Sequence, residues 1–165
     1  MNDKILYSPW RMKYILSEKD NKCIFCINKE ASDADHLIVY RSTTCYVILN
    51  LYPYNNGHIL VVPNRHIAVL SDLDQEELFD LFRIVQMSER VIKKVYSPDG
   101  INIGINLGKA AGAGIDDHIH VHLVPRWSGD VNFMTSVSGT RVIPDDFHNS
   151  FKILKEGFDN DNDNK

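Results

Sequence analysis

Three histidines alternate with apolar residues in the C-terminal half of the chain. His118, His120 and His122 are separated by single residues, Ile119 and Val121. In a β-strand successive side chains point to opposite faces, so the imidazoles are expected to line one face and the apolar residues the other. Neighbouring imidazoles would then lie about 7 Å apart, close enough to share a phosphate-sized ligand or to divide between metal binding and catalysis. A row of idle surface histidines is the weaker interpretation, because chance seldom places three of seven histidines on one strand face.

A pair of cysteines, Cys23 and Cys26, has the spacing of a metal knuckle. No strand is expected directly before them, which argues against a thioredoxin-like redox pair and favours metal binding. Zinc is the metal that the sequence predicts. It prefers four nitrogen or sulfur ligands, so two further donors are required, and histidine is the available type. The third cysteine, Cys45, lies in an apolar run and is interpreted as a small buried residue.

A loop of small residues, from Leu107 to Gly114, directly precedes the histidine segment. Glycine lets the backbone approach a ligand closely, so main-chain N–H groups at Gly112 and Gly114 are candidates for cradling phosphate oxygens. The loop is neither a Walker A sequence nor a dinucleotide fingerprint, because it lacks the closing Lys-Ser or Lys-Thr and the third glycine.

The elements that must position these residues follow from hydrophobic periodicity. Strands are predicted at residues 36–41, 44–51, 58–63, 101–106 and 118–124. An acidic start at residues 71–77 and an apolar stripe from Leu78 to about Val95 predict one long helix, and a short amphipathic helix is expected within residues 1–22. The expected fold is α+β, with an antiparallel sheet of about five strands covered on one side.

The composition is that of a single globular domain. The chain has 165 residues, 44% of them hydrophobic, which is enough for a substantial core. A net charge of −4 without a basic stripe predicts no nucleic-acid partner. No apolar run approaches the ~20 residues of a membrane span and no leader is apparent, so we expect a cytoplasmic protein with no membrane partner. The domain is expected to cover residues 1–158, and the Asp- and Asn-rich tail 159–165 to be disordered.

The segment 118–124 resembles the signature of the histidine-triad (HIT) family at every position. The similarity continues over roughly residues 7–134, and includes Trp10-Arg11, Cys23 and Cys26, Asn50, the run 57–63, Asn106 and the segment 125–133. The last segment is most similar to the branch that cleaves diadenosine tetraphosphate by hydrolysis or phosphorolysis. The resemblance implies a HIT-like fold, a homodimer and an AMP-containing dinucleoside polyphosphate as substrate.

The resemblance also implies catalytic roles for the histidines. His120 would be the nucleophile that attacks the α-phosphorus, and its nucleotidyl intermediate would be resolved by water or phosphate. His122 would stabilise the charge that develops on that phosphate. His118 belongs to the same triad, and His58 would support it from the neighbouring strand.

Further residues match positions that bind nucleotide or metal in the family. Asn50 resembles the contact to the ribose hydroxyls, and Asn106 the amide that touches the phosphate or the leaving group. Some family members hold zinc in a closed structural site with four protein ligands. The positions that match those ligands are Cys23, Cys26, His66 and His118.

One departure from the family leaves the reaction open. Many members have Gln and then Ser or Thr where this chain has Gly114 and Ile115. Backbone N–H groups of the glycine loop could replace the missing side chains, so either water or phosphate could resolve the intermediate. Hydrolysis of adenosine 5′-phosphoramidates would use the same residues with another leaving group. Two alternatives belong to other functional classes: a nucleotide-binding regulatory module and a zinc-dependent interaction domain. Slow or absent turnover of nucleotide substrates would favour these alternatives over an enzyme.

Overall fold

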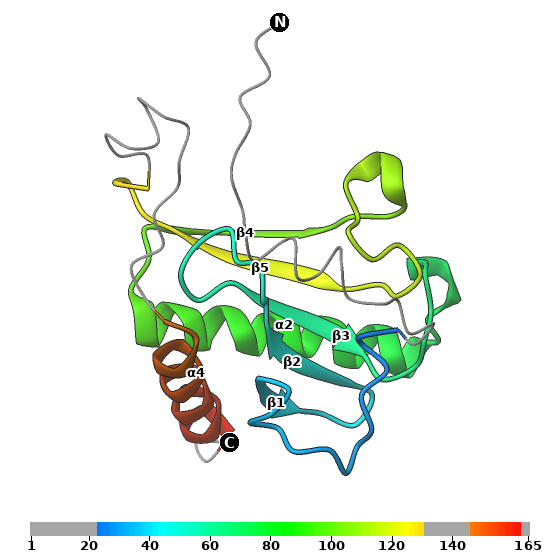
Figure 1. Cartoon of the computed structure of the whole chain (residues 1–165), viewed down its shortest axis with the longest axis horizontal. Coiled ribbons are helices and arrows are strands. Elements are labelled where there is room, and N and C mark those ends of the chain that lie inside the picture. Colours follow the sequence, from blue (N-terminus) through cyan, green and yellow to red (C-terminus); the bar gives the residue numbers. More distant parts are fainter. Residues whose placement is uncertain (1–22, 131–145, 163–165) are drawn as a thin grey trace, which may run out of the picture.

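The computed structural model describes residues 23–130 and 146–162, which form a five-stranded sheet with helices on one face (Figure 1). The strand order is β1-β2-β3-β5-β4, and every neighbouring pair is antiparallel. The strands are β1 (Ile38–Arg41), β2 (Cys45–Leu49), β3 (Ile59–Pro63), β4 (Gly100–Ile105) and β5 (Val121–Arg126). The predicted α+β class, antiparallel sheet and long helix are confirmed. In this part of the chain no helix has the length and apolarity required to cross a membrane.

The long helix α2 (Gln75–Tyr96) begins at a capping box. Asp74 accepts a hydrogen bond from the N–H of Glu77 at 2.8 Å, and the Glu77 carboxylate accepts one from the N–H of Asp74 at 3.1 Å. Each bond satisfies an N–H group near the helix start that has no partner within the helix. The expected start at residues 71–72 is therefore too early. Those residues belong instead to the 3-10 turn η1 (Leu70–Asp72).

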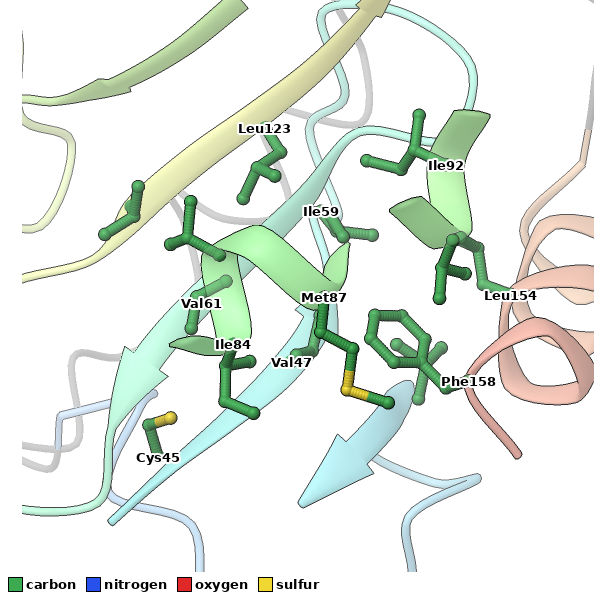
Figure 2. Packing of buried hydrophobic residues seen from close by; sticks show 14 of the residues in the cluster. Cys45, Val47, Ile59, Val61, Ile84, Met87, Ile92, Leu123, Leu154 and Phe158 are labelled. Atoms are coloured by element: carbon green, nitrogen blue, oxygen red, sulfur yellow. The ribbon is translucent and has the colours of Figure 1, made fainter. Parts of the chain in front are cut away.

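The main core lies between the sheet and α2. Strand residues such as Val47, Val61 and Leu123 pack against Ile84 and Met87 of the helix, and all five are inaccessible to solvent (Figure 2). Burial of each such side chain contributes about 1.5–3 kcal/mol. A smaller cluster covers part of the opposite face. Its buried members are Phe25, Ile38, Tyr46, Ile48, Leu60 and Val62.

A second helix, α4 (Phe147–Asn162), packs against α2 and was not predicted. Phe158 is fully buried in the main core, and Asp161 accepts a hydrogen bond from Arg90 of α2 at 3.1 Å. Residues 159–162, which the sequence assigned to a disordered tail, are helical, and residues 163–165 lie outside the described residues. Tertiary packing outweighs the low helix propensity of an Asp- and Asn-rich stretch. The helix expected within residues 1–22 lies outside the described residues.

The histidine segment enters the sheet later than predicted. β5 begins at Val121, so His118 and His120 precede the strand and only His122 lies within it. The N–H of Ile119 bonds instead to the carbonyl of Ile67 at 2.7 Å. His58 likewise comes directly before β3. The candidate catalytic residues thus lie at and just beyond the ends of two paired strands, where loops can reach them.

Candidate active site and metal centre

The predicted catalytic histidines lie along the short antiparallel ladder between β3 and β5. His122 is paired with Leu60 of β3 and Gly104 of β4. Because Leu60 belongs to the cluster on the face away from α2, His122 also lies on that face. The ring centre of His122 is 4.8 Å from that of His120 and 5.3 Å from that of His58. The structure therefore brings these three imidazoles into one group.

The backbone orients His120 with a free ring nitrogen. Its Nδ1 lies 2.9 Å from the carbonyl oxygen of His118. A carbonyl oxygen can only accept a hydrogen bond, so Nδ1 carries the proton and Nε2 keeps its lone pair. Burial lowers the pKa of His120, although the hydrogen bond to His118 opposes this effect. A neutral imidazole with a lone pair on Nε2 is the form required for nucleophilic attack.

His58 and His122 form a second ordered pair. The backbone N–H of Tyr54 donates to Nδ1 of His58 at 3.0 Å, so the proton of neutral His58 is on Nε2. That Nε2–H donates to Nδ1 of His122 at 3.0 Å. His122 must then carry its own proton on Nε2, where it can donate to a ligand. This chain of donors and acceptors assigns His122 as a neutral hydrogen-bond donor.

Burial keeps this pair uncharged. It lowers the pKa of His58 to about 3, and the nearby His122 and His120 act in the same direction. Burial and the nearby His120 lower the pKa of His122 to about 4. Both rings are therefore neutral at pH 7, as the order of hydrogen bonds requires.

Both predicted asparagines lie beside this group. The amide nitrogen of Asn50, directly after β2, is 3.3 Å from Nδ1 of His58, and its amide oxygen accepts from the N–H of Tyr52 at 2.9 Å. Asn106 follows β4 and lines a pocket of about 300 Å³ together with His122. The two asparagines therefore approach the histidines from different sides, one from β2 and one from β4.

The glycine loop is less open to phosphate than the sequence predicts. The N–H of Gly112 donates to the carbonyl of Lys109 at 3.0 Å, closing the 3-10 turn η2 (Lys109–Ala111). In this conformation Gly112 has no N–H group to offer a ligand. Gly114 lies in the same loop, where a Cβ atom would meet no heavy atom within 4 Å.

Cys23, Cys26, His66 and His118 converge into one cluster. Each offers one ligand atom, and these atoms lie within 4.8 Å of one another. Cys23 Sγ is 3.3 Å from Nδ1 of His118, and Cys26 Sγ is 3.3 Å from Nδ1 of His66. Nε2 of His118 donates to the carbonyl of Pro63 at 2.9 Å, which leaves its Nδ1 lone pair facing the sulfurs. The cluster could hold a metal ion.

Without a cation, Cys23 favours the neutral thiol. Burial raises the pKa of this thiol to about 11, and the neighbouring Cys26 acts in the same direction. Thiolates bind metals, whereas thiols do not, so a divalent cation is the partner that would stabilise the charged form at neutral pH. Two sulfurs and two imidazole nitrogens at these separations fit a tetrahedral ion.

Sequence reasoning missed three residues of the site. The Phe25 ring lies 5.0 Å from the His120 ring, and the Tyr54 ring lies 4.9 Å from the His58 ring. Neither gives a local sequence signal. Arg126 lines the same pocket as His122, and its even spacing from the histidines along β5 could have indicated a shared face.

Known proteins resemble the chain in both sequence and fold. A family model described as HIT domain matches residues 31–129. AP-4-A phosphorylase of Mycobacterium tuberculosis is 40% identical over 158 residues, which cover 90% of this chain and 81% of that protein. The asymmetrical bis(5′-nucleosyl)-tetraphosphatase of Schizosaccharomyces pombe is 42% identical over 93 residues, which cover 56% of this chain and 50% of that protein. A Zn-bound histidine triad family protein of Mycobacterium smegmatis superposes with a TM-score of 0.70 at 29% identity, covering 88% of this chain and 99% of that one.

Proposed function

This chain belongs to the HIT domain family, and from that premise we propose that it cleaves dinucleoside polyphosphates, such as diadenosine tetraphosphate, at the α-phosphate. The relatives named phosphorylase and tetraphosphatase indicate an enzyme of the family's nucleotide hydrolases and phosphorylases. The observation that carries the proposal is the order of protons at the site. His120 offers a lone pair at Nε2, and His122 offers a donor at Nε2–H.

In the first step, Nε2 of His120 attacks the α-phosphorus. The bond from phosphorus to the bridging oxygen breaks, and the leaving nucleoside polyphosphate takes the electron pair. The proton stays on Nδ1 of His120, and its hydrogen bond to the carbonyl of His118 disperses the positive charge on the ring. His122 donates a hydrogen bond to the phosphate as negative charge builds on it. The product is a nucleotidyl group bound to His120.

In the second step, water or inorganic phosphate attacks the same phosphorus. The N–P bond breaks, and its electron pair returns to Nε2 of His120. Phosphate as acceptor yields a nucleoside diphosphate, whereas water yields a nucleoside monophosphate and a proton. We favour phosphate, because the relative that matches 90% of this chain is named a phosphorylase.

The same proposal places Zn²⁺ in the cysteine and histidine cluster. The donor set and its spacing support this choice, as does the Zn-bound family protein. When bound, the ion would join the loop before β1, the loop after β3 and the start of the histidine segment. All four ligands come from the protein, so this is a structural site, and the nucleophile remains His120.

A cytoplasmic homodimer completes the proposal. In the described part of the chain, β4 is an edge strand with a partner on one side only. The apolar side chains of Phe79 and Phe82 on α2 and of Ile103 on β4 are exposed, Phe79 by 73%. Edges and apolar patches of this kind favour association with another chain. Cys23, Cys26 and Cys45 form no disulfide among the described residues, which suits a reducing compartment.

Product analysis tests the reaction. The purified protein is incubated with diadenosine tetraphosphate, with and without inorganic phosphate, and the nucleotides are separated by anion exchange. ADP and ATP formed only with phosphate identify a phosphorylase, whereas AMP and ATP formed without phosphate identify a hydrolase. Turnover of adenosine 5′-phosphoramidate alone would change the substrate class. Tight nucleotide binding without turnover of either compound would favour the regulatory module.

A further inference from the structure

The pocket beside His122 extends well beyond the histidines. It lies over β4 and β5, and its lining includes Asn102, Gly104 and Asn106 on one side and His122, Val124 and Arg126 on the other. The three β5 residues alternate along the strand and therefore share one face. Arg126 is four residues from His122, about 13 Å along the strand. The pocket thus runs from the proposed α-phosphate contact to a guanidinium group.

The pocket has free space beside Gly104, where a chain of phosphates would lie. Gly104 is paired with His122 across the ladder, and a Cβ atom placed on it would meet no heavy atom within 4 Å. Asn50 approaches from the opposite side, beside His58 and next to β2. If the nucleoside of the transferred nucleotide binds near Asn50, the leaving group extends over β4 and β5.

Two neighbouring side chains hold Arg126 in place. Its Nε donates to Asp130 at 2.7 Å, and its Nη1 donates to the amide oxygen of Asn102 at 2.8 Å. Asp130 accepts a further bond at 2.9 Å from Asn55, a residue only 7% exposed. A guanidinium has five N–H groups, and among residues 23–130 and 146–162 no acceptor contacts Nη2. The fork is therefore preorganised, with donors to spare for a ligand in the pocket.

We propose that Arg126 binds a phosphate of the leaving nucleotide and thereby selects substrates whose leaving group is a polyphosphate. The inference rests on the proposed cleavage at His120. Planar guanidinium groups match phosphate oxygens in a bidentate manner, and the strength of such bonds rises where the partner is charged. An uncharged leaving group, such as the ammonia of a phosphoramidate, gains nothing from Arg126. Arg126 would thus favour a dinucleoside polyphosphate over a phosphoramidate as the substrate.

Kinetics with two substrates tests this role. In Arg126→Gln, the KM for diadenosine tetraphosphate is expected to rise by about 10- to 100-fold. This factor of about 10 to 100 corresponds to the binding free energy lost with one hydrogen bond to a charged group. Because adenosine 5′-phosphoramidate has no distal phosphate, its kcat/KM is expected to change by less than about threefold. Arg126→Lys, which keeps the charge, is expected to restore part of the loss. Arg90→Gln, which removes an arginine paired with Asp161 elsewhere, is the matched control.

Equal losses on both substrates would overturn the proposal and assign Arg126 a structural role in holding residues 127–130. A raised KM for inorganic phosphate with an unchanged KM for the dinucleotide would also overturn it, by assigning Arg126 to the acceptor. Calorimetric titration with inorganic triphosphate gives a readout independent of turnover. Weaker binding to Arg126→Gln is expected, and unchanged binding contradicts the proposal. If the wild-type protein cleaves neither substrate, the proposed reaction fails, while the titration still decides the role of Arg126.

Discussion

Three backbone groups set the protonation pattern of the candidate site. The carbonyl of His118 accepts a hydrogen bond from His120, and the carbonyl of Pro63 accepts one from His118. The N–H of Tyr54 donates a hydrogen bond to His58. Backbone groups cannot exchange these roles, because a carbonyl only accepts and an N–H only donates. Each histidine therefore has one tautomer when neutral. The chemical differences between four side chains of the same type arise from their partners.

Replacement of the nucleophile is the most direct test at the scale of single residues. His120→Ala is expected to lower kcat by several orders of magnitude, because no other group supplies the lone pair at that position. Circular dichroism and metal content are expected to stay unchanged. His148→Ala, at an exposed position of α4, is the control. Activity of His120→Ala within about tenfold of wild type would contradict the proposed intermediate.

The buried pair His58 and His122 predicts loss of stability in mild acid. Their pKa values in the folded protein, about 3 and about 4, lie below the ordinary value of 6.5. The unfolded chain therefore binds protons first as the pH falls. Above pH 6.5 the pair has no effect, and between pH 7 and pH 5 the free energy of unfolding is expected to fall by about 2 kcal/mol for each ring.

Urea unfolding at several pH values measures this effect. His58→Gln removes one of the two rings, so its free energy of unfolding is expected to depend less steeply on pH than that of the wild type. The wild type and the variant are compared at equal zinc saturation, since metal ligands also titrate. A wild-type free energy that stays constant from pH 7 to pH 5 would show that these rings are charged in the folded protein.

At the scale of elements, the metal cluster connects three segments that lie outside the strands of the sheet. The loop that contains Cys23 and Cys26 comes before β1, His66 follows β3, and His118 precedes β5. We expect one zinc per chain, measured by elemental analysis and native mass spectrometry. Cys26→Ser is expected to lower zinc content and Tm, because it removes a ligand. Cys45→Ala removes a buried thiol outside the cluster and is expected to keep the metal. Absence of zinc from the purified protein, with unchanged stability of Cys23→Ser, would refute the assignment.

A carboxylate joins the β1–β2 turn to α2. Asp80 accepts hydrogen bonds from Ser42 and Thr44 of the turn and from Arg83 of the helix. Burial alone would raise the pKa of Asp80, but these hydrogen bonds outweigh it and lower the pKa to about 2. Asp80→Ala is expected to reduce the free energy of unfolding by about 1–3 kcal/mol, because it leaves the backbone N–H and the hydroxyl of Thr44 without their acceptor. Thermal unfolding measures the loss. Asp159→Ala, at an exposed position of α4, is expected to change stability little.

At the scale of the whole molecule, the exposed face of α2 predicts self-association. Phe79, exposed by 73% in the single chain, would be buried if a second copy covered this face. Sedimentation of the wild type is expected to show a dimer, and Phe79→Glu is expected to shift it toward the monomer. Phe147→Glu, on the exposed start of α4, is the control and is expected to remain dimeric. A monomeric wild type at micromolar concentration would contradict the homodimer.

The sequence by itself determined the chemical groups of the candidate site and the elements that hold them. The alternation at 118–122, the spacing of Cys23 and Cys26, and the apolar stripe of the long helix are periodic over a few residues. Such patterns are readable because the geometry of strands and helices is local. They predicted the five-stranded sheet and its long helix. The cysteine spacing predicted two metal ligands, and the resemblance to the HIT family added His66 and His118, which the structure brings together with them.

Only the tertiary structure decided how these groups act. Cys23 meets His118 across 95 residues, and Pro63 orients His118 across 55. Three further features were visible only in the folded chain. Phe158 of α4 packs into the main core, and the N–H of Gly112 is hydrogen-bonded within its own loop. His122 and Arg126 line one pocket. Tautomers, pKa values and pockets depend on partners in space, and local periodicity carries no information about which distant segments will become neighbours.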